Sequence, residues 1–243
     1  MLSIFQKELN TFFSSLIGYI VIGVFLVFLG LMMFVFTDTS LLNYQYATLE
    51  QLFSLAPLIF IFLIPAITMR SFSEEHQTGT IELLVTRPLR DSSIVLGKYF
   101  ACLLLVAFAL LPTLLYVYTV YSLGSPVGNI DLGAVAGSYI GLLFLAAGFV
   151  SIGVFASSVS NNQIVAFTLA TFLCFLFYWG FLFFSKLPIF VGRVDDVVQM
   201  IGIDYHYRSM SRGVLDSRDV IYFLSLITLF ILATVISLGR RKW

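Results

Sequence analysis

Between two long apolar runs the chain reads Ser73-Glu74-Glu75-His76-Gln77-Thr78-Gly79-Thr80-Ile81-Glu82-Leu83-Leu84-Val85-Thr86-Arg87-Pro88, and the pair Gly97-Lys98 closes this polar segment. The flanking apolar runs come close to or exceed the roughly 20 residues that cross a lipid bilayer. The segment therefore joins two predicted membrane spans on one face of the membrane. An aqueous partner on that face would meet these residues first.

The composition is that of an integral membrane protein. Hydrophobic residues make up 60% of the 243 residues and charged residues 11%, and the mean hydropathy is +1.01. A soluble domain carries about 25% charged residues. The formal net charge of zero gives no reason to expect nucleic-acid binding. Cys102 and Cys174 fall inside predicted spans, where a thiol behaves as a small hydrophobe, so no disulfide is expected.

We expect an all-α membrane protein with one transmembrane domain over residues 1–243 and six spans. Residues 1–15 carry Leu2, Phe5, Leu9 and Phe12 at helical spacing, which favours a helix in the membrane interface over a plain extension of the first span. The first apolar run is too long for a cleavable signal peptide. The predicted spans are 16–36, 52–69, 94–123, 132–158, 163–184 and 220–238.

Basic residues near the span ends indicate the orientation. Several of them, including Lys7, Arg70 and the tail Arg240-Arg241-Lys242, lie on the face that would carry both termini, whereas the loops 37–51 and 124–131 contain none. Cytoplasmic loops are enriched in Lys and Arg. We therefore expect both termini in the cytoplasm.

Two features predict how the spans are shaped and packed. Gly133, Gly137 and Gly141 recur every four residues in the fourth span, and such small residues allow helices to approach closely, either within one chain or in a dimer. Pro112 removes one backbone hydrogen bond within the third span, which predicts a kink.

The outer segment 185–219 predicts a short amphipathic helix. Val194, Val197, Val198 and Ile201 have helical spacing, so this helix would rest at the membrane boundary or cap the bundle. Asp216 or the following serine is a candidate cap of the last span.

Several kinds of site are missing from the sequence. Apart from Lys98, near the start of the third span, the interiors of the six predicted spans lack ionisable residues, which disfavours an ion-coupled carrier. Backbone carbonyls and hydroxyls can still bind Na⁺. Gly97-Lys98 lacks the upstream glycine of GxxxxGK[ST], so the chain would not bind ATP by that route. His76 and His206 have no companions at metal-ligand spacing.

The polar segment 70–93 allows two interpretations. Ser71-x-x-Glu74 fits a capping box at a helix start, with a later serine or threonine as the alternative cap. A helix through residues 81–86 would be amphipathic, and Pro88 would end it. The segment is either a contact element for a partner or an amphipathic connector whose charges are merely solvated.

The combination Glu74-Glu75-x-x-Thr78-Gly79-Thr80-x-Glu82-x-Leu84-x-x-x-Pro88, followed by Gly97-Lys98 and a span, resembles the cytoplasmic signature of the ABC-2 class of ABC-transporter permeases. The order of interfacial helix, six spans and outer amphipathic element is similar over essentially the whole chain. The opening Phe12-Phe13-Ser14-Ser15-x-x-Gly18-Tyr19 and the run 212–219 resemble the gliding-motility permeases of Bacteroidota, the GldF group.

This resemblance implies a half-transporter of the bacterial inner membrane without catalytic residues. A coupling helix between the second and third spans would dock on a separate ABC ATPase, which would bind ATP and Mg²⁺, so the chain itself would hold no cofactor. A second permease half, identical or different, would share the pathway. The gliding-motility likeness implies an auxiliary membrane subunit and a role in motility and associated secretion. The implied ATPase contacts are Glu74, Glu75, Thr78, Gly79, Thr80 and Glu82, with Pro88, Gly97 and Lys98 shaping the return into the membrane.

Two other functions stay open on the residues alone. One is a membrane assembly factor or mechanical transmitter that moves no solute through itself. The other is an ion-coupled secondary carrier, which the apolar span interiors disfavour.

Overall fold

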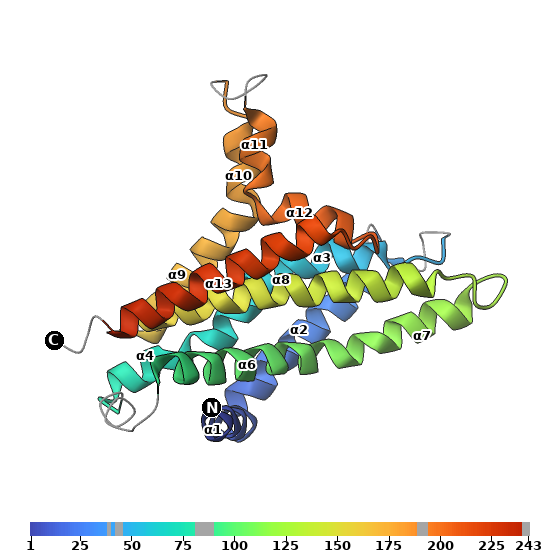
Figure 1. The fold of residues 1–243 in the computed structure, drawn as a ribbon. Coiled ribbons are helices and arrows are strands. Elements are labelled where there is room, and N and C mark those ends of the chain that lie inside the picture. The colour runs from blue at the N-terminus through green and yellow to red at the C-terminus, as the bar shows by residue number, and fades with distance from the viewer. Residues whose placement is uncertain (38–39, 42–45, 81–89, 189–193, 240–243) are drawn as a thin grey trace.

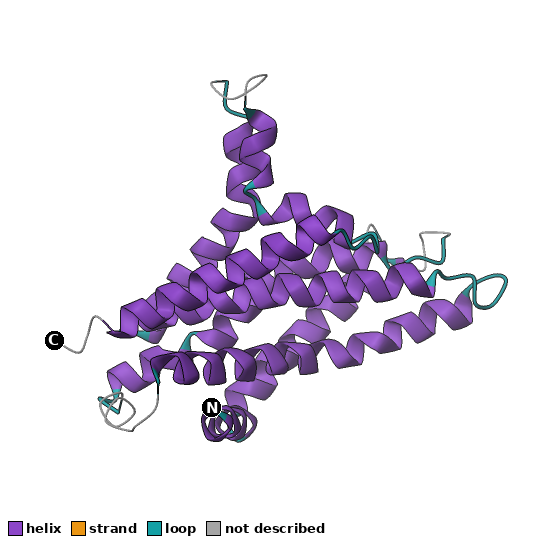
Figure 2. Ribbon diagram, viewed as in Figure 1, coloured by secondary structure: helices purple, strands orange, loops and turns teal. Residues whose placement is uncertain are grey.

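The computed structural model describes residues 1–37, 40–41, 46–80, 90–188 and 194–239, and its regular elements there are all helices. Figure 1 shows the long helices side by side in a bundle, and Figure 2 shows that helices make up most of the described chain. Within these described ranges, five helices are long and apolar enough to cross a membrane, and the pair α1 (Leu2–Phe13) and α2 (Leu16–Phe34), bent by 68°, raises the number to six if it forms one span. The chain is thus an all-α, multi-pass membrane protein, as predicted.

The later spans lie close to their predicted bounds, because inside a bilayer each backbone polar group must be bonded within its own helix. The second is α3 (Glu50–Thr68), which runs on into α4 (Arg70–Gln77). The third is α6 (Asp91–Leu110) with η2 (Leu111–Thr113) and α7 (Leu114–Leu123), and the fourth is α8 (Leu132–Val159). The fifth combines α9 (Gln163–Phe175), η3 (Leu176–Gly180) and α10 (Phe181–Ser185), and the last is α13 (Ser217–Gly239).

Two spans contain irregular turns. Pro112 lies in η2, a single 3₁₀ turn that interrupts the α-helical hydrogen bonds, as the missing N–H of proline predicts. In the fifth span η3 is a π-helical turn, which the sequence did not predict. Such turns insert an extra residue into a helix and redirect the turns after it.

The centre of the bundle is α8, which packs against α3, α6, α9 and α13. A Cβ atom on Gly153 would overlap Thr68 of α3, so only glycine allows this crossing. Gly137 and Gly141 likewise admit the backbone of Gly213 and the side chain of Met210. This part of the predicted small-residue stripe is therefore an intramolecular packing surface. Gly133 differs, because its added Cβ would meet only Asp131 of its own first turn, at 3.2 Å.

The outer segment departs from the prediction. A helix does form at the predicted valines, α11 (Asp195–Met200), but none of its residues is buried, and Figure 1 shows it projecting from the bundle beside α10. The packed amphipathic helix is the next one, α12 (Ile203–Met210), which buries Ile203, Tyr207 and Met210. These residues have the same helical spacing, and the chain turns at Gly202 just before them. At the end of the segment, Asp216 Oδ1 accepts from the N–H of Arg218 at 2.9 Å and caps α13, as predicted.

Candidate coupling site

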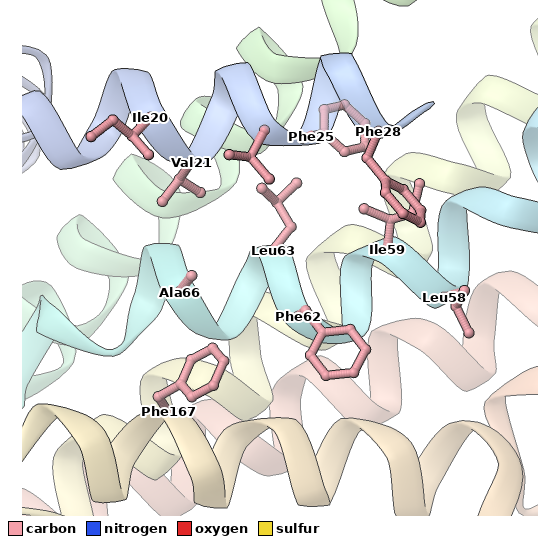
Figure 3. Close-up of a pocket in the computed structure, with 11 residues that line it drawn as sticks. Ile20, Val21, Phe25, Phe28, Leu58, Ile59, Phe62, Leu63, Ala66 and Phe167 are labelled. Carbon is pink, nitrogen blue, oxygen red and sulfur yellow. The ribbon is translucent and has the colours of Figure 1, made fainter. Parts of the chain in front are cut away.

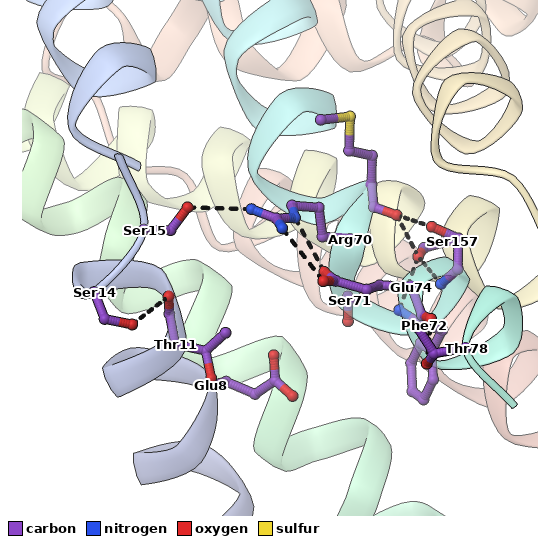
Figure 4. Close-up of polar contacts among 12 residues, drawn as sticks. Glu8, Thr11, Ser14, Ser15, Arg70, Ser71, Phe72, Glu74, Thr78 and Ser157 are labelled. Atoms are coloured by element: carbon purple, nitrogen blue, oxygen red, sulfur yellow. Dashed lines mark hydrogen bonds and ion pairs between the residues drawn. The ribbon is translucent and has the colours of Figure 1, made fainter. Parts of the chain in front are cut away.

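The helix α4 continues α3 without a side-chain cap, because Met69 between them is itself helical. The hydroxyl of Ser157, near the end of α8, accepts from the backbone N–H groups of Phe72 and Ser73 at 2.9 and 3.1 Å and donates to the carbonyl of Met69 at 2.9 Å. Figure 4 shows this hydroxyl beside the backbone where the two helices meet. Ser157 therefore ties α4 to α8. The capping box predicted at Ser71 is wrong, since Ser71 lies inside the helix.

Four charged side chains from three helices form what we term the charged cluster: Lys7 and Glu8 of α1, Glu75 of α4 and Lys98 of α6. Lys98 Nζ lies 2.8 Å from Glu8 Oε1 and 3.0 Å from Glu75 Oε2. Lys7 Nζ lies 2.9 Å from Glu75 Oε1 and 3.9 Å from Glu8 Oε1. Two cations thus face two carboxylates, and helices separated by up to 90 residues are joined.

Lys98 is the most deeply buried member of the cluster. Its side chain is 1% exposed, and that of Glu75 is 8% exposed. The ammonium also donates to the carbonyl of Ser71 and lies 4.9 Å from the centre of the Phe72 ring. Glu75 Oε2 is within ion-pair distance of Lys98 but outside hydrogen-bond geometry, so charge attraction dominates that contact. A buried ammonium requires such partners, because an unpaired charge would be strongly destabilising.

Lys7 closes the cluster on its exposed side. Partial burial disfavours its charged form, but the hydrogen bond to Glu75 and the negative charges of Glu75, Glu8 and Glu74 outweigh burial and raise the pKa of Lys7. Lys7 therefore stays cationic at physiological pH and balances the cluster.

A second polar link joins α4 to the start of α2. Arg70 Nε donates to Glu74 Oε2 at 3.0 Å, and its Nη1 donates to the hydroxyl of Ser15 at 3.2 Å. In Figure 4 the guanidinium of Arg70 lies between these two side chains. The carboxylate of Glu74 is 38% exposed, so this pair lies at the surface and contributes less than the charged cluster.

The remaining predicted contact residues form an exposed turn after α4. Thr78, Gly79 and Thr80 are exposed, and the two threonine hydroxyls lie 2.9 Å apart. Gly79 has a φ of 70°, a left-handed backbone that glycine adopts at little cost. The predicted helix over 81–86, and with it Glu82 and Pro88, lies outside the described residues.

The structure changes the place of two predicted residues. Glu75 was expected to face a partner, but its carboxylate points into the protein and is used by Lys7 and Lys98. Gly97 faces α1, where an added Cβ would lie 3.2 Å from the carbonyl of Met1 and from Ile4. Gly97 and Lys98 thus hold α1 against α6.

Three participants were not predicted from the sequence: Lys7, Glu8 and Ser157. A signal for Glu8 was present, because Lys98 lies within an apolar run and needs a negatively charged partner. Ser157 gave no signal, since serines near a helix end are common and its partners lie 84 or more residues away.

Figure 3 shows an apolar groove on the side of the bundle, between α2 and α3 with Phe167 of α9. The groove has a volume of about 420 Å³ and is lined by aliphatic and aromatic side chains, among them Phe25, Phe28 and Phe62. None of the lining residues carries a charge, so the groove suits apolar groups only.

Comparison with known proteins bears on most of the chain. A family model described as "ABC-2 family transporter protein" matches residues 2–191 of the 243-residue chain. No curated protein matches the chain. The matched region includes the charged cluster, the exposed turn after α4 and the first five predicted spans.

Proposed function

Because the chain belongs to the ABC-2 family of transporter proteins, and is therefore a permease subunit of an ABC transporter, we propose that α4 and the turn after it couple the bundle to a separate ABC ATPase. This ATPase would bind ATP and Mg²⁺, and the chain itself would contribute contact residues and no catalytic group. The proposed contact surface comprises Glu74 and the exposed Thr78–Thr80 turn, together with Glu82 of the family-like sequence pattern that runs from Glu74 to Pro88.

The observation that carries this proposal is the way α4 is fastened. It continues α3, is bonded to α8 through Ser157, and shares the charged cluster with α1 and α6 through Glu75. A displacement of α4 would therefore move several helices together, since packed and ion-paired elements shift as rigid units. A merely solvated connector would not need a buried ion pair.

The proposal extends to orientation and partners. We assign α4 and both termini to the cytoplasmic side of a bacterial inner membrane, on the strength of the basic residues near the span ends. A second permease half, either another copy or a different chain, would complete the transporter. The absence of a phosphate-binding loop from the sequence agrees with an external source of energy.

We further propose a role in gliding motility and its associated secretion, with an auxiliary membrane subunit as an additional partner. Its support is the likeness of residues 12–19 and of the run 212–219 to the gliding-motility permeases. Loss of surface spreading after deletion of the gene, restored by the wild-type chain, would support this assignment. Normal spreading of the deletion strain would contradict it and leave the coupling proposal intact.

The coupling proposal is tested by reversing a charge on its surface. Glu74→Lys should leave the fold intact, because Glu74 is partly exposed, and should reduce the ATPase that co-purifies with the chain at least about tenfold if one charged contact worth roughly 1.5 kcal/mol or more is lost. The matched control is Asp196→Lys, the same charge change on exposed α11. Equal ATPase recovery from both variants and the wild type would contradict the proposal.

A further inference from the structure

The far end of the bundle holds a second polar site that the coupling proposal does not use. His206 of α12 lies between α11 and α13, and its side chain is 12% exposed. Its Nδ1 is 2.7 Å from Asp219 Oδ1, and its Nε2 is 2.9 Å from the carbonyl of Met200. Each ring nitrogen thus faces an oxygen acceptor.

The number of protons on the ring decides whether both contacts can form. A backbone carbonyl only accepts, and an ionised carboxylate only accepts. A neutral imidazole has one N–H donor, whereas the imidazolium has two. The second oxygen of Asp219 accepts from the hydroxyl of Ser209, as expected of an ionised carboxylate. The geometry therefore fits a protonated His206.

The surroundings of the ring also favour a cation. Tyr222 of α13 stacks on His206 with the ring centres 3.9 Å apart and the planes at 20°, and aromatic faces attract cations. Asp219 is 10% exposed, so its charge is poorly screened by water.

Other titratable groups near the ring do not oppose this charge. Tyr205 meets the ring edge-on at 5.3 Å, and Asp204 and Arg208 pair with each other at 2.6 Å. The remaining charged or titratable groups on the elements packed against α12 are Tyr178 in η3, Asp195 and Asp196 in the first turn of α11, Tyr139 on α8, and the exposed Arg218 at the start of α13.

We infer that His206 is a pH-sensitive latch that holds the projecting α10–α11 hairpin to α13. While protonated, it bonds the end of α11 and the start of α13 at once, and the hydroxyl of Tyr222 adds a bond to the carbonyl of Ile201 at 2.7 Å. As the pH rises, the His206 ring loses one proton, and one of its nitrogens then presents a lone pair to an oxygen acceptor. One of the two bonds is then lost, and the bond from Tyr222 to Ile201 remains, so α11 is held less firmly to α13.

The first test reads the protons directly, by ¹⁵N-histidine NMR of the full chain in lipid nanodiscs over a pH titration. The signal that disappears in His206→Gln should be that of an imidazole protonated on both nitrogens at low pH and should lose one proton as the pH rises. In Asp219→Asn, which removes the negative partner, the same change should occur at a lower pH than in the wild-type chain. A His206 signal that changes at the same pH in both chains, or that is neutral throughout, would overturn the inference.

The second test follows the hairpin itself. Spin labels at Val197 of α11 and Ile221 of α13, both exposed, report the separation of the two helices. The distance distribution should be narrow at low pH and broaden as the pH rises past the range in which histidine loses its charge, and His206→Gln should abolish this pH dependence. A pH-independent wild-type distribution, or the same pH response in His206→Gln, would overturn the latch.

Discussion

Replacing Lys98 by methionine tests whether the charged cluster holds α1, α4 and α6 together. Methionine keeps much of the length of the side chain but removes the ammonium that lies 2.8 Å from Glu8 and 3.0 Å from Glu75. The cluster then holds two carboxylates and one cation, Lys7, whose side chain is 55% exposed. Removing one partner of a buried ion pair costs about 3–5 kcal/mol, so we expect Lys98→Met to lower the free energy of unfolding by that amount.

The matched control is Lys7→Met, which makes the same change of charge and shape on the exposed side of the cluster. An exposed ion pair contributes about 0–1 kcal/mol, so this variant should lose no more than that. The double variant Lys98→Met/Glu75→Gln removes one charge of each sign and keeps the cluster neutral. Its loss of unfolding free energy should be smaller, by about 1–3 kcal/mol, than the sum of the losses in Lys98→Met and Glu75→Gln.

Unfolding of the purified chain in mixed micelles, followed by circular dichroism during titration with a denaturing detergent, gives these free energies. The reasoning would be refuted if Lys98→Met and Lys7→Met cost the same small amount. It would also be refuted if the effects of Lys98→Met and Glu75→Gln simply added.

Two further predictions concern packing around α8. Ser157→Ala removes the hydroxyl that bonds α4 and leaves buried backbone groups unsatisfied, which should cost about 1–3 kcal/mol of unfolding free energy. The control Ser158→Ala loses only a bond to Phe155 of its own helix and should cost less than about 1 kcal/mol. Equal losses for the two variants in the same unfolding assay would contradict this prediction. Gly137→Ala should cost about 1–3 kcal/mol, because its methyl group would overlap Gly213. Gly133→Ala should be neutral or stabilising by up to about 1 kcal/mol from helix propensity, and a thermal unfolding midpoint for Gly137→Ala at or above that of Gly133→Ala would exclude the close contact.

Much of the fold could be predicted because it depends on local signals. Apolar runs locate the helices, and Pro112, which predicted a kink in the third span, lies in the 3₁₀ turn of that span. The glycines at 137 and 141 favoured close packing, but only the structure places Gly213 against Gly137 and Met210 against Gly141. The π-helical turn η3 had no such marker, because its residues are as apolar as their neighbours.

The candidate site was only partly predictable because its decisive contacts are long-range. The sequence located α4 and its charges, but it could not distinguish an exposed Glu74 from a buried Glu75 one residue later. That difference depends on Lys7 and Lys98, which reach Glu75 from two other helices. The same holds for α11 and α12: both have apolar spacing, and packing against α8 decides that α12 is the buried one.

Photo-crosslinking in native membranes tests the coupling role of the turn after α4 most directly. A crosslinking amino acid at Thr80, in this turn, is compared with one at Val127, an exposed position in the loop between α7 and α8. We predict that Thr80 crosslinks to a protein carrying a phosphate-binding loop and that Val127 does not. Absence of any ATP-binding protein among the Thr80 products, in membranes where the Val127 control shows efficient crosslinking to other partners, would contradict the coupling role.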